Sequence, residues 1–246
     1  MRYLMTFSYD GSGFKGYQVQ PRMRTVQGEI QKALKQINNN VSVTINASGR
    51  TDALVHALNQ YAHFDLDVSI TCDKLLQALN SLTPSDIYVK KIIEVDPNFH
   101  ARFDVRAKEY IYKINMGTFD CIERNYVYQI NKKLDLVEME RALKYLEGTH
   151  NFRAFTKVDE EKDFVRSIVQ TNLIRDLRNI NKFTISFLGT GFLRYQVRNM
   201  VGLLIEIGEG KRKSEDVITV LASCDRCQAG VIAPPEGLYL NNVFYK

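Results

Sequence analysis

An aspartate and an arginine two residues apart, Asp52 and Arg50, offer the most distinctive chemistry in the chain. A carboxylate placed in a pocket can act as a nucleophile, and a neighbouring guanidinium keeps it ionised by lowering its pKa. The same residues also suit a plain turn between two strands, in which Thr51 or Asp52 caps a short helix. Taken alone, the residue types leave both interpretations open.

Residues 11–16 (GSGFKG) match the G-x-G-x-x-G pattern directly after an expected strand. A dinucleotide site needs a helix that begins at those glycines, so that its N-terminus meets the pyrophosphate. Here Pro21 and Arg22 intervene and the next helix is expected only after Thr25, so a nucleotide-dependent enzyme fits poorly. A turn at a sheet edge, or a turn whose N–H groups and Lys15 contact an RNA phosphate, fits the segment better.

The cysteines and histidines do not form a recognisable site. Cys224-x-x-Cys227 is half of a zinc pattern, but a structural zinc site needs four ligands and no histidine lies near the pair. Cys72 and Cys121 are isolated, so we expect free thiols and no metal. The four histidines are scattered, and none pairs with a serine or cysteine in an obvious triad arrangement.

Charge and hydropathy exclude several classes of protein. The chain has 33 Lys and Arg against 28 Asp and Glu, and its net charge of +5 permits a nucleic-acid partner without requiring one. Its 45% of hydrophobic and 25% of charged residues are typical of a globular protein. No run approaches the roughly 18 apolar residues of a membrane-spanning helix. Because Asp10 precedes any signal-peptide hydrophobic region, we expect a cytoplasmic protein.

The first hundred residues predict a β-α-β-β-α-β unit. Period-two alternation of apolar residues marks strands, and a 3.6-residue period marks helices, the first of which has Thr25 as its N-cap. Strands are expected over 2–9, 41–47, 60–66 and 87–95, and helices over 26–38 and 73–82.

The rest of the chain repeats this order. Strands are expected over 108–115, 165–175, 182–188 and 237–245, and helices over 135–146 and within 191–208. Two such units in succession indicate an internal duplication of the ferredoxin-like split βαβ plan. Pairing of their edges predicts an α+β fold with one extended, mostly antiparallel sheet, helices on one side and a long groove between the halves.

Five blocks of sequence, in order, resemble the TruA-type tRNA pseudouridine synthases. The most informative is Gly49-Arg50-Thr51-Asp52-Ala53-x-Val55-His56-Ala57, which is similar to the active-site signature of that family. The other blocks are residues 9–18 (YDGSGFKGYQ), 99–103 (FHARF) followed by Tyr110-x-Tyr112, 191–202 (GFLRYQVRNMVG) and 233–240 (APPEGLYL). Together they extend over nearly the whole chain.

The resemblance implies a fold, a reaction and partners. Bacterial enzymes of this family isomerise uridine to pseudouridine at positions 38, 39 and 40 of the tRNA anticodon stem-loop. They use no cofactor and no metal, and they act as homodimers. The pseudouridine synthase fold would then have an N-terminal half, 1–103, with the catalytic aspartate loop, and a C-terminal half, 104–246, which completes a central RNA-binding cleft.

The resemblance also assigns residues. Asp52 matches the nucleophile, which attacks C1′ of the ribose or, in a glycal route, acts after removal of a C2′ proton. Arg50 matches a residue that extrudes and replaces the target base. Tyr110 matches the active-site tyrosine, whose ring stacks on uracil and whose hydroxyl helps remove the C5 proton. The remaining substrate-binding residues expected are Arg198, paired with the nucleophile, Leu238, packed against the base, and Gln18 and Lys15 in the first block.

The chain departs from the family pattern near these residues. Leu54 stands where the family usually has glycine, which permits a positive φ or a close approach of RNA, so a catalytic loop of different shape is expected. Tyr17, Tyr195 and Gln196 also differ from the residues common in the family. These departures indicate a divergent paralogue. They leave an alternative function, a catalytically weak or inactive tRNA-binding or folding protein on the same scaffold.

Overall fold

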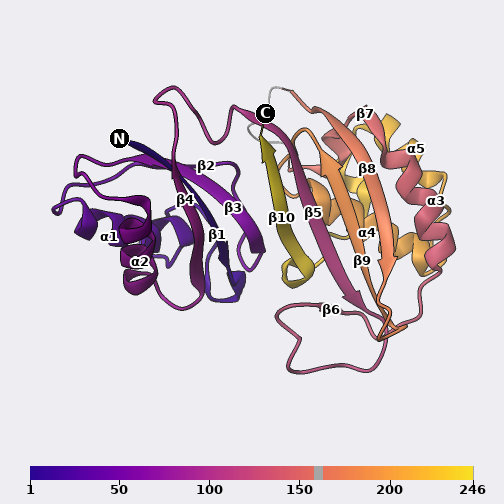
Figure 1. Ribbon diagram of the computed structural model, residues 1–246. Helices are drawn as coiled ribbons and strands as arrows, with labels where there is room; N and C mark the ends of the chain where they lie inside the picture. Colours follow the sequence, from indigo (N-terminus) through magenta and orange to yellow (C-terminus); the bar gives the residue numbers. More distant parts are fainter. Residues whose placement is uncertain (158–162, 246) are drawn as a thin grey trace. The chain divides into compact units, whose positions relative to one another are not determined.

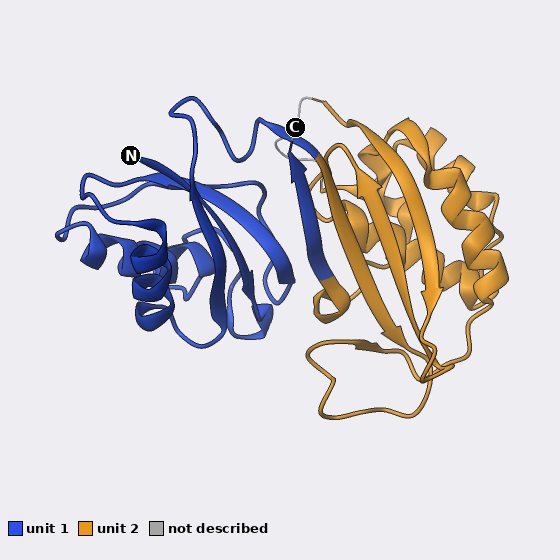
Figure 2. Cartoon of the chain, in the orientation of Figure 1, with its two compact units in different colours: residues 1–106, 239–246 blue, residues 107–238 orange. Residues whose placement is uncertain are grey.

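The computed structural model describes residues 1–157 and 163–245. The chain divides into two compact units, residues 1–106 with 239–246 (unit 1) and residues 107–238 (unit 2), which Figure 2 colours separately. The described residues form ten β-strands and five α-helices. The strand ladders given below are antiparallel, except for two short ones. This content confirms the α+β class that the sequence predicts.

Unit 1 is a small sheet with two helices. Its elements are β1 (Arg2–Tyr9), α1 (Val26–Ile37), β2 (Ile45–Ala47), β3 (His56–Asp65), α2 (Cys72–Leu82), β4 (Ile87–Glu94) and most of β10 (Leu238–Tyr245) (Figure 1). β1 is central and antiparallel to β3 and β4. The other edge of β3 is shared, because β2 pairs with residues 62–64 and β10 with residues 56–57. The order β4-β1-β3-β2 is that of the predicted ferredoxin-like unit.

The core of unit 1 is formed by alternate residues of its strands and by one apolar face of its helices. Alternate residues of β1 point to one face, and Tyr3, Met5 and Phe7 are completely buried there. α1 begins where Thr25 Oγ1 accepts a hydrogen bond from the N–H of Gly28 (3.3 Å), which confirms the predicted cap. The helix buries its apolar stripe, Val26, Ile30, Ala33 and Leu34.

Unit 2 has the same plan with additions. Its elements are β5 (Val105–Asn115), β6 (Tyr128–Gln129), α3 (Leu136–Leu146), β7 (Gly148–Asn151), β8 (Val165–Arg175), β9 (Lys182–Gly189), α4 (Gln196–Gly208) and α5 (Asp216–Ser223). The strands run β5-β9-β8-β7, each antiparallel to the next. The three helices lie together on one face of this sheet (Figure 1). α4 is buried almost all round, so it forms the centre of the unit 2 core.

Two differences from the sequence prediction concern the position of the site. β3 begins at His56, four residues before the predicted start, because Ala57 pairs with Tyr9 of β1 and with Leu240 of β10. β2 covers only 45–47 of the predicted 41–47. The residues that precede β3 therefore enter a strand that long-range pairing holds on both sides.

Candidate active site

Asp52 begins a four-residue turn between β2 and β3. The N–H of Val55 donates to the Asp52 carbonyl (3.2 Å), and Leu54, third in the turn, has a φ of +67°. A positive φ at that place defines a type II turn, for which glycine is the usual residue. Leucine adopts the conformation at a cost of about 1–2 kcal/mol. Leu54 therefore keeps the backbone that glycine would permit.

The outer side of this turn faces solvent. Asp52 is half-buried, whereas Arg50, Ala53 and Leu54 are exposed. Within the described residues, Arg50 makes no hydrogen bond or ion pair. Arg50 therefore makes no ion pair with Asp52 in this structure, and its guanidinium is exposed.

Buried side chains of β1 and β3 support the turn. The hydroxyl groups of Tyr9 and Thr51 share a buried hydrogen bond of 2.8 Å. Burial raises the pKa of Tyr9 to about 12, so its phenol stays neutral. Ser48 Oγ donates to Gln60 Oε1 (2.6 Å), and Gln60 Nε2 donates to the carbonyl of Gly49 (3.0 Å). The loop is therefore anchored just before Arg50 and again just before Asp52.

The glycine-rich segment forms a second support. The N–H of Gly11 donates to Nδ1 of buried His56 (3.0 Å), and the N–H of Leu54 donates to the carbonyl of Phe14 (3.3 Å). A Cβ on Gly11 would lie 2.1 Å from the carbonyl oxygen of Val55. The glycine is required because two backbones meet there.

This packing separates the three interpretations of the glycine motif. Gly11–Gly13 form a 3₁₀ turn, and α1 begins thirteen residues after that turn ends, at Val26, so no helix N-terminus meets the glycines. The nucleotide-binding interpretation is therefore not supported. Lys15 and Gln18 are exposed in this segment, on the same unit as Asp52.

Unit 2 carries the other predicted residues. Tyr110 in β5 is buried, and its ring meets that of Phe192 edge to face with centroids 5.1 Å apart. Two residues along the strand, on the same face, the hydroxyl of Tyr112 donates to the carbonyl of Pro234 (2.7 Å). Burial raises the pKa of Tyr112 well above its ordinary value. Tyr112 thus fixes the segment that leads into β10.

That segment crosses the start of α4 and orients Arg198. Nε of Arg198 donates to the Ala233 carbonyl (2.8 Å), and the N–H of Ala233 donates back to the Arg198 carbonyl (3.0 Å). A Cβ on Gly202 would lie 1.8 Å from the oxygen of Val231, so the helix and the segment are in direct backbone contact. Leu238 follows as the buried first residue of β10.

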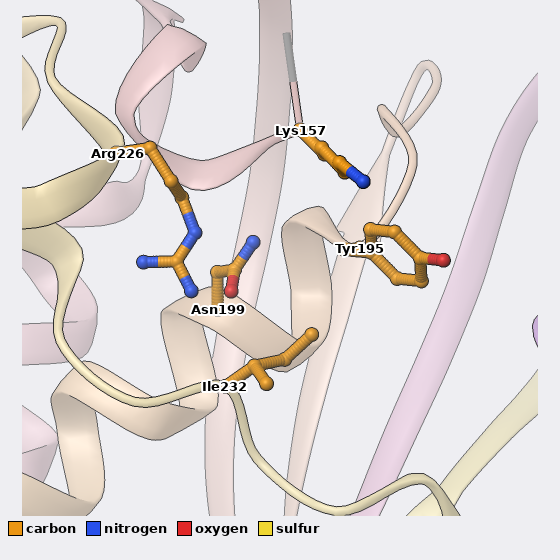
Figure 3. A pocket seen from close by; sticks show the side chains of 5 residues that line it. All are labelled: Lys157, Tyr195, Asn199, Arg226 and Ile232. Carbon is orange, nitrogen blue, oxygen red and sulfur yellow. The ribbon is translucent and has the colours of Figure 1, made fainter.

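A cavity of about 360 Å³ lies beside the first turn of α4. Its lining is Lys157, Tyr195, Asn199, Arg226 and Ile232, and Figure 3 shows Lys157 and Tyr195 on one side and Arg226 on the other. Nδ2 of Asn199 donates to the Phe155 carbonyl (2.6 Å), which joins α4 to the 3₁₀ turn at Arg153–Phe155. Sequence reasoning did not identify this cavity, whose residues come from three separate segments.

Six basic residues in loops and at helix ends, Lys15, Arg22, Arg24, Lys211, Arg212 and Lys213, divide into two groups by their ion pairs. Arg24 makes a two-pronged ion pair with Asp86 (2.7 and 2.9 Å), Lys211 pairs with Glu209, and Arg212 pairs with Glu206. These three side chains already have ion-pair partners within the protein. Lys15, Arg22 and Lys213 form no ion pair among the described residues.

No helix in the described part of the chain has the length and apolar character needed to cross a membrane. The four cysteines are free thiols, as the sequence predicts.

Comparisons with known proteins agree with the resemblance seen in the sequence. A family model described as tRNA pseudouridine synthase matches residues 5–104 and 142–246. Three similar curated proteins are each named tRNA pseudouridine synthase A. That of Geobacillus sp. (strain WCH70) is 43% identical over 98% of this chain and 96% of its own length. Those of Oceanobacillus iheyensis (43%; 98% and 95%) and Anoxybacillus flavithermus (42%; 98% and 97%) are equally similar. The chain therefore belongs to the tRNA pseudouridine synthase family.

Proposed function

We propose that this protein is a tRNA pseudouridine synthase that acts on uridines 38, 39 and 40 of the anticodon stem-loop, with Asp52 as its nucleophile. The observation that carries the proposal is the turn that begins at Asp52. It lies within the family signature, it is closed by a hydrogen bond, and it is supported from two directions by buried groups.

The proposed reaction exchanges one bond to C1′ for another. The Asp52 carboxylate attacks C1′ of the extruded nucleotide, and the bond from C1′ to N1 of uracil breaks. The detached uracil turns, and its C5 forms a bond to C1′ as the carboxylate leaves. The C5 proton is then removed and N1 gains a proton. A carboxylate suits this task because it bonds reversibly to an oxocarbenium-like carbon.

The other residues take roles that fit their surroundings. The exposed Arg50 occupies the space that the flipped base leaves, where a planar guanidinium can stack. Tyr110 stacks on the uracil and accepts the C5 proton. Arg198, oriented by Ala233, pairs with the Asp52 carboxylate, and Leu238 packs against the base. Residues 1–103 thus supply the aspartate loop, and residues 104–246 supply three further groups to the same reaction.

The proposal extends to partners. The substrate is the tRNA anticodon stem-loop, with Lys15 and Gln18 as exposed contacts beside the Asp52 turn. We propose a homodimer located in the cytoplasm, where tRNA is modified. The isomerisation needs no added electron or group carrier, since uridine and pseudouridine have the same composition and oxidation state. No observation favours an inactive tRNA-binding protein, because the turn is closed with Leu54 in it.

The test is release of tritium from tRNA labelled with [5-³H]uridine, with wild type beside Asp52→Asn. Loss of the C5 hydrogen is intrinsic to the reaction. We expect release by the wild type and none by Asp52→Asn, with tRNA affinity retained because asparagine has nearly the same shape. Absence of release by the wild type, with intact tRNA binding, would reject the proposed activity on these uridines.

A further inference from the structure

Leu54 combines two unfavourable features beside the proposed nucleophile. Its backbone φ of +67° is a conformation that residues other than glycine and asparagine rarely adopt. Its apolar side chain is also 38% exposed, so the strain is not offset by full burial in the core. Strained residues of this kind persist at sites where the strained geometry serves function.

The surroundings of Leu54 fix the direction of its side chain. The N–H groups of Leu54 and Val55 are bonded to the carbonyls of Phe14 and Asp52, and Val55 rests on Gly11. The inner side of the turn is therefore occupied by backbone. The side chain is left on the solvent side, and Arg50 and Ala53 of the same loop are also exposed.

We infer that Leu54 is a substrate-binding residue that packs against the base next to the target uridine once that uridine has left the stack. This inference rests on the proposed function. Flipping a base exposes the apolar face of its neighbour, and apolar side chains such as leucine can wedge into an opened base step. Arg50 fills the vacated position by stacking and charge, while Leu54 covers the adjacent base face.

The contact has a distinct consequence for specificity. An apolar contact with a base face reads no hydrogen-bonding pattern, so it tolerates different neighbouring bases. It stabilises the flipped state in every tRNA that places a base there. Leu54 is expected to strengthen the complex with RNA and to leave the chemistry at C1′ and C5 unaffected.

The experiment compares Leu54→Gly with two other variants. Leu54→Met keeps an apolar side chain, and Asn40→Gly places glycine at a matching φ of +65° in the loop after α1. Leu54→Gly is expected to raise the thermal midpoint, whereas Asn40→Gly should change it little, because asparagine already tolerates that conformation. Only Leu54→Gly is expected to lower kcat/KM for tRNA, by about 5- to 30-fold, the lower part of the range for loss of one stacked base, because leucine is not aromatic. Its single-turnover rate with saturating enzyme stays within about twofold, since chemistry is spared.

The outcomes separate contact from structure. A Leu54→Gly enzyme with unchanged or higher kcat/KM and unchanged tRNA affinity would overturn the inference. So would a loss that Leu54→Met shares in full. If the wild type released no tritium from tRNA, the proposed function would fail, yet tRNA affinity would still test the contact. In that case weaker binding by Leu54→Gly than by Asn40→Gly supports it, and equal binding rejects it.

Discussion

At the scale of single residues, two tyrosines on one face of β5 have different surroundings. The ring of Tyr110 contacts Phe192, while the hydroxyl of Tyr112 is bonded to the Pro234 carbonyl (2.7 Å). Tyr110→Phe keeps the ring and removes the hydroxyl. We expect a loss of C5-tritium release of about 10²- to 10⁴-fold, the usual contribution of a positioned acid or base. Tritium release at saturating tRNA measures it.

Tyr112→Phe is the matched control, because it removes the same atom two residues away. It breaks one hydrogen bond and is expected to lower the free energy of unfolding by about 1 kcal/mol. Its tritium release should fall far less than that of Tyr110→Phe. Equal losses in the two variants would show that β5 contributes only structure and would contradict a chemical role for Tyr110.

The sequence pointed to the proposed reacting residues through the family signature, but not to the residues that hold them. By residue type alone, an Arg two positions before an Asp is compatible with a nucleophile or with a plain turn. Tyr9 and Gln60 look like ordinary strand residues, because their bonds to Thr51 and Gly49 exist only after distant segments meet. The closed turn shows that leucine adopts the positive φ, and a loop shape that differs from that of glycine-bearing relatives stays a prediction.

At the scale of elements, the glycine turn positions the Asp52 turn by direct backbone contact. In Gly11→Ala, the new Cβ would lie 2.1 Å from the Val55 oxygen, which cannot yield without moving the Asp52 turn. We expect a loss of about 1–3 kcal/mol in the free energy of unfolding. We also expect a fall in kcat of at least about tenfold, since misplacement near 1 Å can cost 10²-fold.

Gly13→Ala gives the control from the same motif. Its Cβ would meet Nη1 of Arg24 at 2.9 Å, the far end of a flexible side chain that can move aside. Denaturant unfolding and tritium release should remain close to wild type. If both glycine variants behaved alike, close approach to Val55 would not be the reason for Gly11.

A buried histidine joins β3 to the segment that leads out of unit 1. Nδ1 of His63 accepts a hydrogen bond from the N–H of Ala101 (3.0 Å). Burial first, and then the charges of His100 and Arg2, lower the pKa of His63 from 6.5 to about 4. In the unfolded chain His63 therefore binds a proton near pH 6.5, whereas in the folded chain it binds one only near pH 4.

Stability is expected to fall as the pH drops through that window, by at most about 1.4 kcal/mol per pH unit. His63→Asn keeps an acceptor for Ala101 and does not titrate. Urea unfolding of both proteins from pH 7 to pH 4 measures the difference in their free energies of unfolding. The contributions of the other titrating groups, which both proteins share, cancel in this difference. Parallel pH curves would show that His63 is protonated as readily in the folded state as in the unfolded chain.

The sequence predicted most elements of each unit because their periodicity is local. β1 and β8 match residue for residue, and Thr25 caps α1 as expected. β7 was missed because its residues, GTHN, carry no apolar alternation, and only pairing with β8 makes them a strand. α5 was missed for lack of a clear start signal, since its N-cap residue makes no side-chain cap.

At the scale of the whole molecule, the proposed homodimer needs a surface. The β5–β6 loop and the β8–β9 turn of unit 2 are neighbouring segments (Figure 1). Apolar side chains are strongly exposed in both of them. The segments are joined where the N–H of Met116 donates to the Asn181 carbonyl (2.8 Å). We call this surface the apolar tip. Its residues are Phe119, Ile122, Leu177 and Ile180.

An exposed apolar cluster in a protein without a partner is uncommon, and a symmetric dimer would cover it on both copies at once. Leu177 is fully exposed and Ile180 is 84% exposed, so replacing both with serine should not disturb the core. We expect the double variant to be monomeric by light scattering at micromolar concentration, where the wild type is dimeric. Val231→Ser, at a site elsewhere on unit 2 that is 73% exposed, should remain a dimer. A dimeric double variant would place the interface away from the apolar tip, and a monomeric wild type would reject the homodimer itself.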